Sequence, residues 1–287
     1  MKLKESRAWS FVIVTLVYIL AAGVGVAVYL VLPFDFWLNL LVADVVATVV
    51  TFLFSVIFKN ASVYDPYWSV QPIVIVFAFA FGGTPTVGGI LLIAAITIWG
   101  VRLTANWAYT FHGLNHQDWR YTMLKEKTGA FYPLINFIGI HMVPTLIVYA
   151  CVMPAVAVLY FAPSFDPLSI VFVCVSLAAT LLQGVSDWQM QKFRREKSEG
   201  KASGFIHIGL WKYSRHPNYL GEILMWWGVA LAAVTLMPNR WYLIFGAAAN
   251  TLLFFSVSIP MADNRMADRE GFDEYKKQTR MLLPIKK

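Results

Sequence analysis

The sequence predicts an all-α integral membrane protein, a polytopic bundle of seven or eight transmembrane helices, on three observations. First, 59% of its 287 residues are hydrophobic and only 14% are charged, whereas soluble domains carry about 25% charged residues. Second, the apolar residues gather in uncharged runs of about 20, the length that crosses the hydrocarbon core of a bilayer. Third, the basic residues are distributed unequally among the segments between these runs, as in proteins with alternating cytosolic and external loops.

The predicted spans follow one another along the whole chain. They are Trp9–Leu32, Trp37–Phe58, Trp68–Gly82, Val87–Phe111, Phe131–Phe161, Leu168–Lys192, Leu220–Met237 and Trp241–Pro260. The first is too long for the apolar region of a signal peptide, about 7–15 residues, and no small-residue cleavage site follows it. The third is short and carries Pro72 in its first turn, where proline is tolerated. The fifth contains Pro144 and Pro154, which predict a kink or a break.

The basic residues predict the orientation. With eight spans and a cytosolic N-terminus, every Lys and Arg except Arg102 and Arg240 falls on the cytosolic side, where such residues are enriched. We therefore expect both termini to be cytosolic. The net charge of +7 follows from this orientation and requires no nucleic-acid partner. No repeat or shift in composition divides the chain, so residues 1–287 are expected to form a single membrane domain, with the first two spans in residues 1–60.

Ionisable residues inside the spans are the first candidates for function, because they are costly in the membrane and usually face the interior of the bundle. They are Asp44, Arg102, Asp187 and Glu222. Trp99 and Asn106 share a helix face with Arg102, since they lie three residues before it and four after it. The sequence supports two interpretations of this face of the fourth span equally: a structural role in which Arg102 forms a salt bridge, and ligand binding.

One face of the sixth span combines hydrogen-bonding groups with a cation at helical spacing. Gln183, Asp187, Gln191 and Arg194 lie at i, i+4, i+8 and i+11, which is one side of a helix. Because the stripe runs from the membrane into the cytosol, with Arg195 beside its end, it could hold a ribose and phosphates. The alternative is a solvated helix end with a snorkelling Arg194.

The segment from residue 215 to 222 predicts the start of the seventh span. Proline suits the first helical position, so the helix should begin near Pro217, and its N-terminal amides attract an anion. Asn218 and Glu222 share a face, and Gly221 allows a backbone or a ligand to approach closely. The alternative is a structural cap in which Glu222 pairs with Arg102 or another arginine.

The loop before the third span carries Tyr64, Asp65 and Tyr67, each of which could donate a proton to a carbonyl group. Tyrosine is also common at membrane interfaces for purely amphipathic reasons, so an interface belt is the alternative. The histidines show no metal-ligand spacing, and we predict no metal site.

The run Gly209-Leu-Trp-Lys-Tyr-Ser-Arg-His-Pro-Asn-Tyr-Leu-Gly-Glu222, followed by Trp226-Trp227-Gly228, resembles the C-terminal region of the steroid 5-alpha-reductase family, especially its bacterial branch. Similar segments are Asp65–Trp68, Trp99–Arg102, Asp118–Tyr121 and the tail after Ile259. The resemblance covers roughly residues 60–285. It implies that 61–287 is a reductase-like region and that the protein lies in a bacterial inner membrane.

The resemblance implies a helical bundle that holds NADPH in a cytosol-facing cavity and transfers hydride to the C=C bond of an enone-type lipid or steroid-like substrate, which enters from the bilayer. It places Asn218 and Glu222 near the nicotinamide, and Asp187 and Arg194 on the adenosine and phosphate side. The candidate cofactor-binding residues are Arg102, Asp187, Arg194, Arg195, Tyr213, Arg215, His216, Asn218 and Glu222. The candidate catalytic residues are Tyr64, Asp65, Tyr67 and Glu222. The Gln-Glu pair of the steroid enzymes has no counterpart and Trp99 occupies their tyrosine position, so the proton donor stays open.

Two other classes of protein compete with this interpretation. Isoprenylcysteine and phospholipid methyltransferases carry a similar Arg-His-Pro-x-Tyr-x-Gly run and bind S-adenosylmethionine with it. An acid directly after the glycine, as in Gly221-Glu222, is typical of the reductases. A non-catalytic membrane protein such as a transporter would be expected to show repeats or broken helices around a midplane site, and the sequence has no such repeat.

Overall fold

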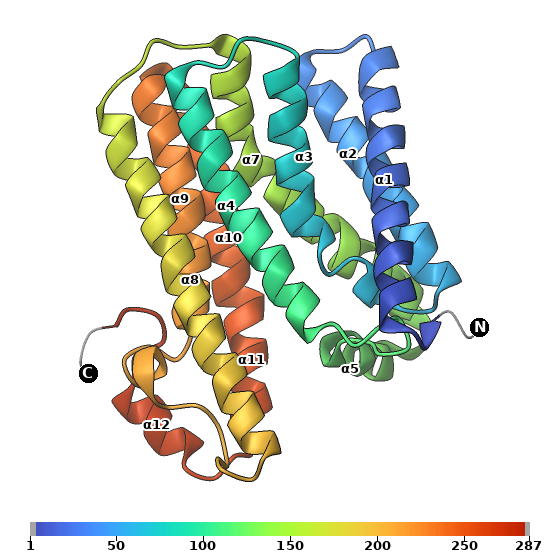
Figure 1. Cartoon of the computed structure of the whole chain (residues 1–287), viewed down its shortest axis with the longest axis vertical. Coiled ribbons are helices and arrows are strands. Elements are labelled where there is room, and N and C mark those ends of the chain that lie inside the picture. Colours follow the sequence, from blue (N-terminus) through green and yellow to red (C-terminus); the bar gives the residue numbers. More distant parts are fainter. Residues whose placement is uncertain (1–3, 285–287) are drawn as a thin grey trace.

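The computed structural model describes residues 4–284 and forms an all-α bundle whose helices run along its long axis (Figure 1). The main helices are α1 (Arg7–Val31), α2 (Phe36–Ile57), α3 (Tyr67–Phe81), α4 (Val87–Thr110), α7 (Val143–Phe161), α8 (Leu168–Ser198), α9 (Pro217–Leu236), α10 (Phe245–Leu253) and α11 (Ile259–Met266). Shorter helices are α5 (Trp119–Thr128), α6 (Tyr132–Ile135) and α12 (Phe272–Gln278). Over residues 4–284 no strand forms, and the isolated bridge pairs Ser214 with Arg280.

Seven helical stretches are long and apolar enough to cross a membrane, which confirms the predicted polytopic bundle. The expected third span is the 15-residue α3. At 1.5 Å per residue it is about 22 Å long, shorter than the hydrocarbon core of about 30 Å. It nevertheless lies among the long helices of the bundle (Figure 1). Proline at position 72 is accommodated inside this helix.

The start of α1 and the C-terminal α12 lie at the same end of the bundle, the lower end in Figure 1. We call it the loop end, because the connections 58–66, 111–118 and 199–216 also lie there. Arg240 lies at the opposite end, in the connection between α9 and α10. The basic residues Lys2, Lys286 and Lys287, which we counted on the cytosolic side, lie outside the described residues.

The expected irregularity of the fifth span lies before its first proline. Residues Asn136–Met142 form a π-helical segment, and α7 follows with Pro144 in its first turn. Because Pro144 has no backbone N–H, it cannot complete the regular ladder of hydrogen bonds at this point. Pro154 lies inside α7 without ending it.

The close packing of α8 against α9 positions the site described below. A Cβ on Gly221 would lie 2.7 Å from the carbonyl oxygen of Ala179, and one on Gly228 would lie 2.7 Å from that of Phe172. Two backbones can approach this closely only where side chains are absent. The predicted close approach at Gly221 is therefore confirmed, as is the helix start at Pro217. This close packing brings the Asn218–Glu222 face of α9 against α8.

Candidate functional site

The carboxylate of Glu222 is the centre of a buried hydrogen-bonding network. Its side chain is 5% exposed. Gln183 Nε2 donates to Glu222 Oε2 over 2.8 Å, and Trp99 Nε1 donates to the same oxygen over 2.9 Å. Trp226 Nε1 donates to Oε1 over 2.9 Å. Three neighbours from α4, α8 and α9 therefore each present an N–H to one carboxylate, and none of them presents an acceptor.

Arg102 extends this network toward the loop end. Its Nη1 donates to Asp187 Oδ2 over 2.6 Å, and its Nη2 donates to Gln183 Oε1. Gln183 thus bridges Arg102 and Glu222. Asn218 Nδ2 contacts Asp187 Oδ1 at 3.5 Å. We call the set Trp99, Arg102, Gln183, Asp187, Asn218, Glu222 and Trp226 the polar network; its helices α4, α8 and α9 lie side by side in Figure 1.

This arrangement differs from the alternative in which Glu222 pairs with Arg102. The two side chains are joined through Gln183, and Arg102 forms its ion pair with Asp187. The Asp187 and Arg102 side chains are 16% and 19% exposed, so this pair loses less hydration than a pair with fully buried Glu222 would. The predicted stripe on the sixth span is confirmed for Gln183, Asp187 and Gln191, whose side chains all face neighbouring helices.

Two hydrogen-bonding positions in the polar network remain open. Arg102 Nε is buried and has no partner. Glu222 Oε1 accepts one hydrogen bond, although a carboxylate oxygen has two lone pairs. Buried polar atoms without a partner are uncommon in folded proteins and call for a physical explanation. One free donor and one free acceptor within a charged network are what a polar ligand would occupy.

The outer candidates on the loop end are placed differently. Arg194 and Arg195, near the end of α8, are exposed, and within residues 4–284 neither guanidinium group makes a hydrogen bond or an ion pair. Tyr213 is 52% exposed. These three side chains are accessible to a ligand that reaches the polar network from the loop end.

Arg215 and His216 are instead buried against the C-terminal segment. Arg215 Nη2 and His216 Nε2 each lie 3.0 Å from a different carboxylate oxygen of Asp263. Both side chains are 8% exposed. Their direct contact with a cofactor stays a prediction, and it would require Asp263 to move away. Asp263 could not be singled out from the sequence, because it stands among several acids in the tail without distinctive spacing.

The three candidate proton donors lie in a separate cluster between α2, α3 and α7. Tyr64 OH is 2.8 Å from Thr145 Oγ1, and Tyr67 OH is 3.5 Å from Asp44 Oδ1. Tyr121 OH donates to Asp65 Oδ1 over 2.5 Å. The structure therefore does not bring these residues into direct contact with Glu222. The link between the two groups is Trp68, whose ring centroid is 6.1 Å from that of Trp99.

Asp65 should make stability depend on pH. Burial raises the pKa of its carboxyl group to about 6, against the opposing effects of the Arg120 charge and the Tyr121 hydroxyl. A raised pKa means that Asp65 favours the folded state below about pH 4 and that this contribution is lost as the pH rises through 6. Through this group the free energy of unfolding of the wild type should fall by up to about 3 kcal/mol over this pH range, and Asp65→Asn should abolish that fall. Thermal melts between pH 4 and 7.5 test this, and parallel profiles for the variant and the wild type would contradict it.

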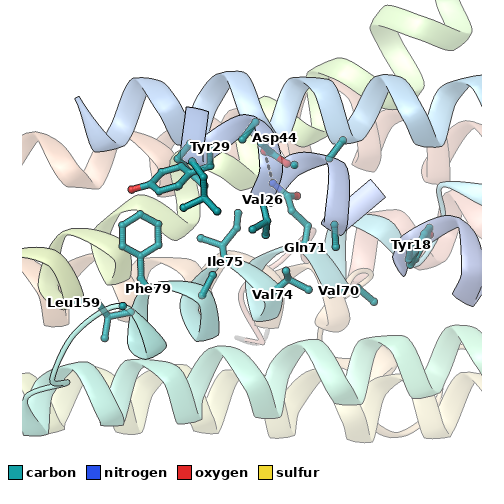
Figure 2. Close-up of a pocket in the computed structure, with 18 of the residues that line it drawn as sticks. Tyr18, Val26, Tyr29, Asp44, Val70, Gln71, Val74, Ile75, Phe79 and Leu159 are labelled. Carbon is teal, nitrogen blue, oxygen red and sulfur yellow. Dashed lines mark hydrogen bonds between the residues drawn. The ribbon is translucent and has the colours of Figure 1, made fainter. Parts of the chain in front are cut away.

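An apolar cavity of about 560 Å³ lies between α1, α2, α3 and the end of α7 (Figure 2). Most of its wall is aliphatic or aromatic, including Val26, Val74 and Phe79. Its polar lining includes Asp44, Gln71 and Tyr67, with Gln71 Nε2 donating to Asp44 Oδ2, and three further tyrosines, Tyr18, Tyr29 and Tyr160. Gln71 Oε1 is buried without a partner. The size lies within the range of about 300–1,000 Å³ that is typical of ligand pockets.

The fold and these contacts define a polytopic helical membrane protein with a buried charged network at one end and a separate apolar cavity. The chain belongs to the DUF1295 family, described as protein of unknown function, whose model matches residues 51–279. In general terms, this is the family of steroid 5-alpha-reductase-like proteins.

One curated relative is the uncharacterized protein C594.04c of Schizosaccharomyces pombe, 26% identical over 193 residues. The match covers 58% of this chain and 56% of that protein, so the chain spans about half the length of the relative. No solved structure matches the chain.

Proposed function

We propose that the protein is an NADPH-dependent membrane reductase of the bacterial branch of the steroid 5-alpha-reductase-like proteins, acting on the C=C bond of an enone-type lipid. The observation that supports this most strongly is the polar network, a conjunction of one ion pair, one buried carboxylate and two open hydrogen-bonding positions. Such a network is costly in a membrane bundle unless something uses it. In this proposal the loop end faces the cytosol of a bacterium, where NADPH is available.

The residues of the network have the chemistry to hold NADPH. Glu222 Oε1 has an acceptor position for an amide N–H such as that of the nicotinamide carboxamide. Asp187 and Asn218 offer acceptors and a donor to ribose hydroxyls, and the exposed Arg194 and Arg195 offer charge to phosphates. NADPH, when bound, supplies the hydride. The work of the protein is then to orient the cofactor, to exclude water and to supply one proton.

The substrate proposed for this site has an apolar body with one polar end. The cavity between α1, α2 and α3 provides an apolar wall for the body, and its lining includes Asp44, Gln71 and Tyr67. Figure 2 shows Asp44 and Gln71 between the apolar side chains of this wall. Of the three candidate proton donors, Tyr67 is the one that lines this cavity. We therefore assign the donated proton to the Tyr67 hydroxyl, which lies beside Asp44.

Helix α3 lies between the cavity and the polar network. Its Val70, Val74 and Ala78 line the cavity. On the opposite side, Ser69 Oγ lies 2.8 Å from Thr104 Oγ1 of α4. The reacting end of a substrate would thus meet the cofactor at the first turn of α3, where Tyr67 lines the cavity and Trp68 contacts Trp99.

The test of the proposal is a thermal-shift measurement on the detergent-purified protein with NADPH, NADH and S-adenosylmethionine in parallel. A ligand that binds only the folded state at about 100 times its Kd adds about 2.7 kcal/mol to the free energy of unfolding. We expect NADPH alone to stabilise the protein, and enones then to cause NADPH oxidation. Stabilisation by S-adenosylmethionine alone would contradict the proposal and indicate a methyltransferase. No thermal shift with any of the three ligands would support a non-catalytic membrane protein.

Filling the cavity should separate substrate binding from cofactor binding. Val74 is 38% exposed and lines the cavity, so Val74→Trp is expected to fill space there without disturbing helix packing. We expect it to abolish enone-dependent NADPH oxidation and to leave the NADPH thermal shift unchanged. Val101→Trp is the matched control, because Val101 is exposed on α4 and does not line the cavity. Equal activity of the two variants would show that substrate binds elsewhere.

A further inference from the structure

The carboxylate of Asp263 joins the end of α11 to the segment that precedes α9. It is 8% exposed and lies 3.0 Å from both Arg215 Nη2 and His216 Nε2. Lys276 Nζ lies 3.9 Å away. Arg215 and His216 are separated from Asp263 by 48 and 47 positions in the sequence. One buried carboxylate thus holds two neighbouring side chains directly before the first residue of α9.

The backbone of the C-terminal segment holds the same two residues. Arg215 N donates to the carbonyl of Arg280 over 2.9 Å, and His216 N donates to that of Met281 over 3.2 Å. Arg215 Nη1 also donates to the carbonyl of Thr279 over 2.8 Å. We call Asp263 together with residues 279–281 the clamp.

The clamped segment leads directly into the polar network. His216 is the N-cap of α9, and its ring stacks on Tyr219 with centroids 5.2 Å apart. Pro217 follows, then Asn218, which contacts Asp187. One turn later comes Glu222. A displacement of His216 therefore moves the first turn of α9, on which Asn218 lies, relative to α8.

We propose that the clamp is a positioning device for the ligand site and that Asp263 is its central positioning residue. On this view Arg215 and His216 do not bind the ligand; they connect the clamp to the first turn of α9. Removing Asp263 leaves two buried basic side chains without their carboxylate, a strongly unfavourable arrangement. The first turn of α9 then loses its fixed place against α8. The identity of the ligand rests on the proposed function, whereas the positioning does not.

The first experiment compares Asp263→Ala, Asp263→Glu and wild type by hydrogen exchange in detergent. We expect Asp263→Ala to speed exchange of the amides in 209–222 at least tenfold and to leave α4 and α7 unchanged, and we expect Asp263→Glu to restore much of the protection. Asp268→Ala is the matched control, because Asp268 is an exposed acid in the same tail. Unchanged exchange in 209–222 for Asp263→Ala would overturn the proposal.

The second experiment measures the Kd for NADPH of the same variants, at a temperature where circular dichroism shows each of them to be folded. Removing a residue that orients a metal ligand typically weakens a metal site by about 10- to 100-fold. By analogy, we expect at least a tenfold weaker Kd for Asp263→Ala and a wild-type Kd for Asp268→Ala. A wild-type Kd for Asp263→Ala would overturn the positioning role. If Asp263→Ala does not fold, a truncation that removes residues 279–287 tests the same clamp from its backbone side. If neither the wild type nor any variant binds NADPH, the cofactor assignment is wrong. The hydrogen-exchange experiment still tests whether the clamp fixes the first turn of α9.

Discussion

Glu222→Gln should destabilise the protein even without any ligand. Its three neighbours all donate hydrogen bonds to the carboxylate, from Trp99, Trp226 and Gln183. The glutamine amide replaces one acceptor oxygen by a donor, so at least one buried N–H loses its partner. An unsatisfied buried donor costs about 1–3 kcal/mol. Thermal melts of the ligand-free variant in detergent measure this loss.

The comparison with Asn218→Ala makes this prediction specific. Asn218 is partly exposed, and its contact with Asp187 is 3.5 Å long, so its removal should change the free energy of unfolding by less than about 1 kcal/mol. Under the proposed function both variants lose NADPH binding, and only Glu222→Gln also loses stability. Equal stability of Glu222→Gln and wild type would show that the carboxylate is not the acceptor of these three bonds.

Arg102→Lys should weaken NADPH binding although it keeps the charge. The guanidinium contacts Asp187 and Gln183 at the same time and leaves its Nε as a free donor. A lysine ammonium is a point charge that does not reproduce this planar set of donors. Losing one hydrogen bond to a charged group costs about 1.5–3 kcal/mol, which corresponds to a Kd about 10- to 150-fold weaker.

The matched control for Arg102→Lys is Arg7→Lys, because Arg7 lies on α1 and donates to the carbonyl of Ala108, away from the polar network. Its NADPH affinity should equal that of the wild type. A double-mutant cycle of Arg102→Lys with Asp187→Asn should show coupling, since the two side chains form one ion pair. Additive losses in that cycle would show that Arg102 and Asp187 act on the ligand independently.

The sequence by itself determined the features that depend on local patterns. The apolar runs specified the spanning helices, because a run of about 20 apolar residues has no stable place outside a bilayer or a core. Pro217 specified the start of α9, because its missing N–H and restricted φ suit the first helical turn. The 3.6-residue period placed Gln183 and Asp187 on one face of α8 before any partner was known.

Only the tertiary structure decided which polar groups meet. Trp99 and Glu222 are 123 positions apart, and Arg215 and Asp263 are 48 apart. Arg102 pairs with Asp187 although Glu222 was an equally available acid in the sequence. The reason is that pairing in a bundle follows from which helices pack closely and from how much hydration each group loses. Neither the approach of α8 to α9 nor the burial of Glu222 is encoded by the spacing of residues within one helix.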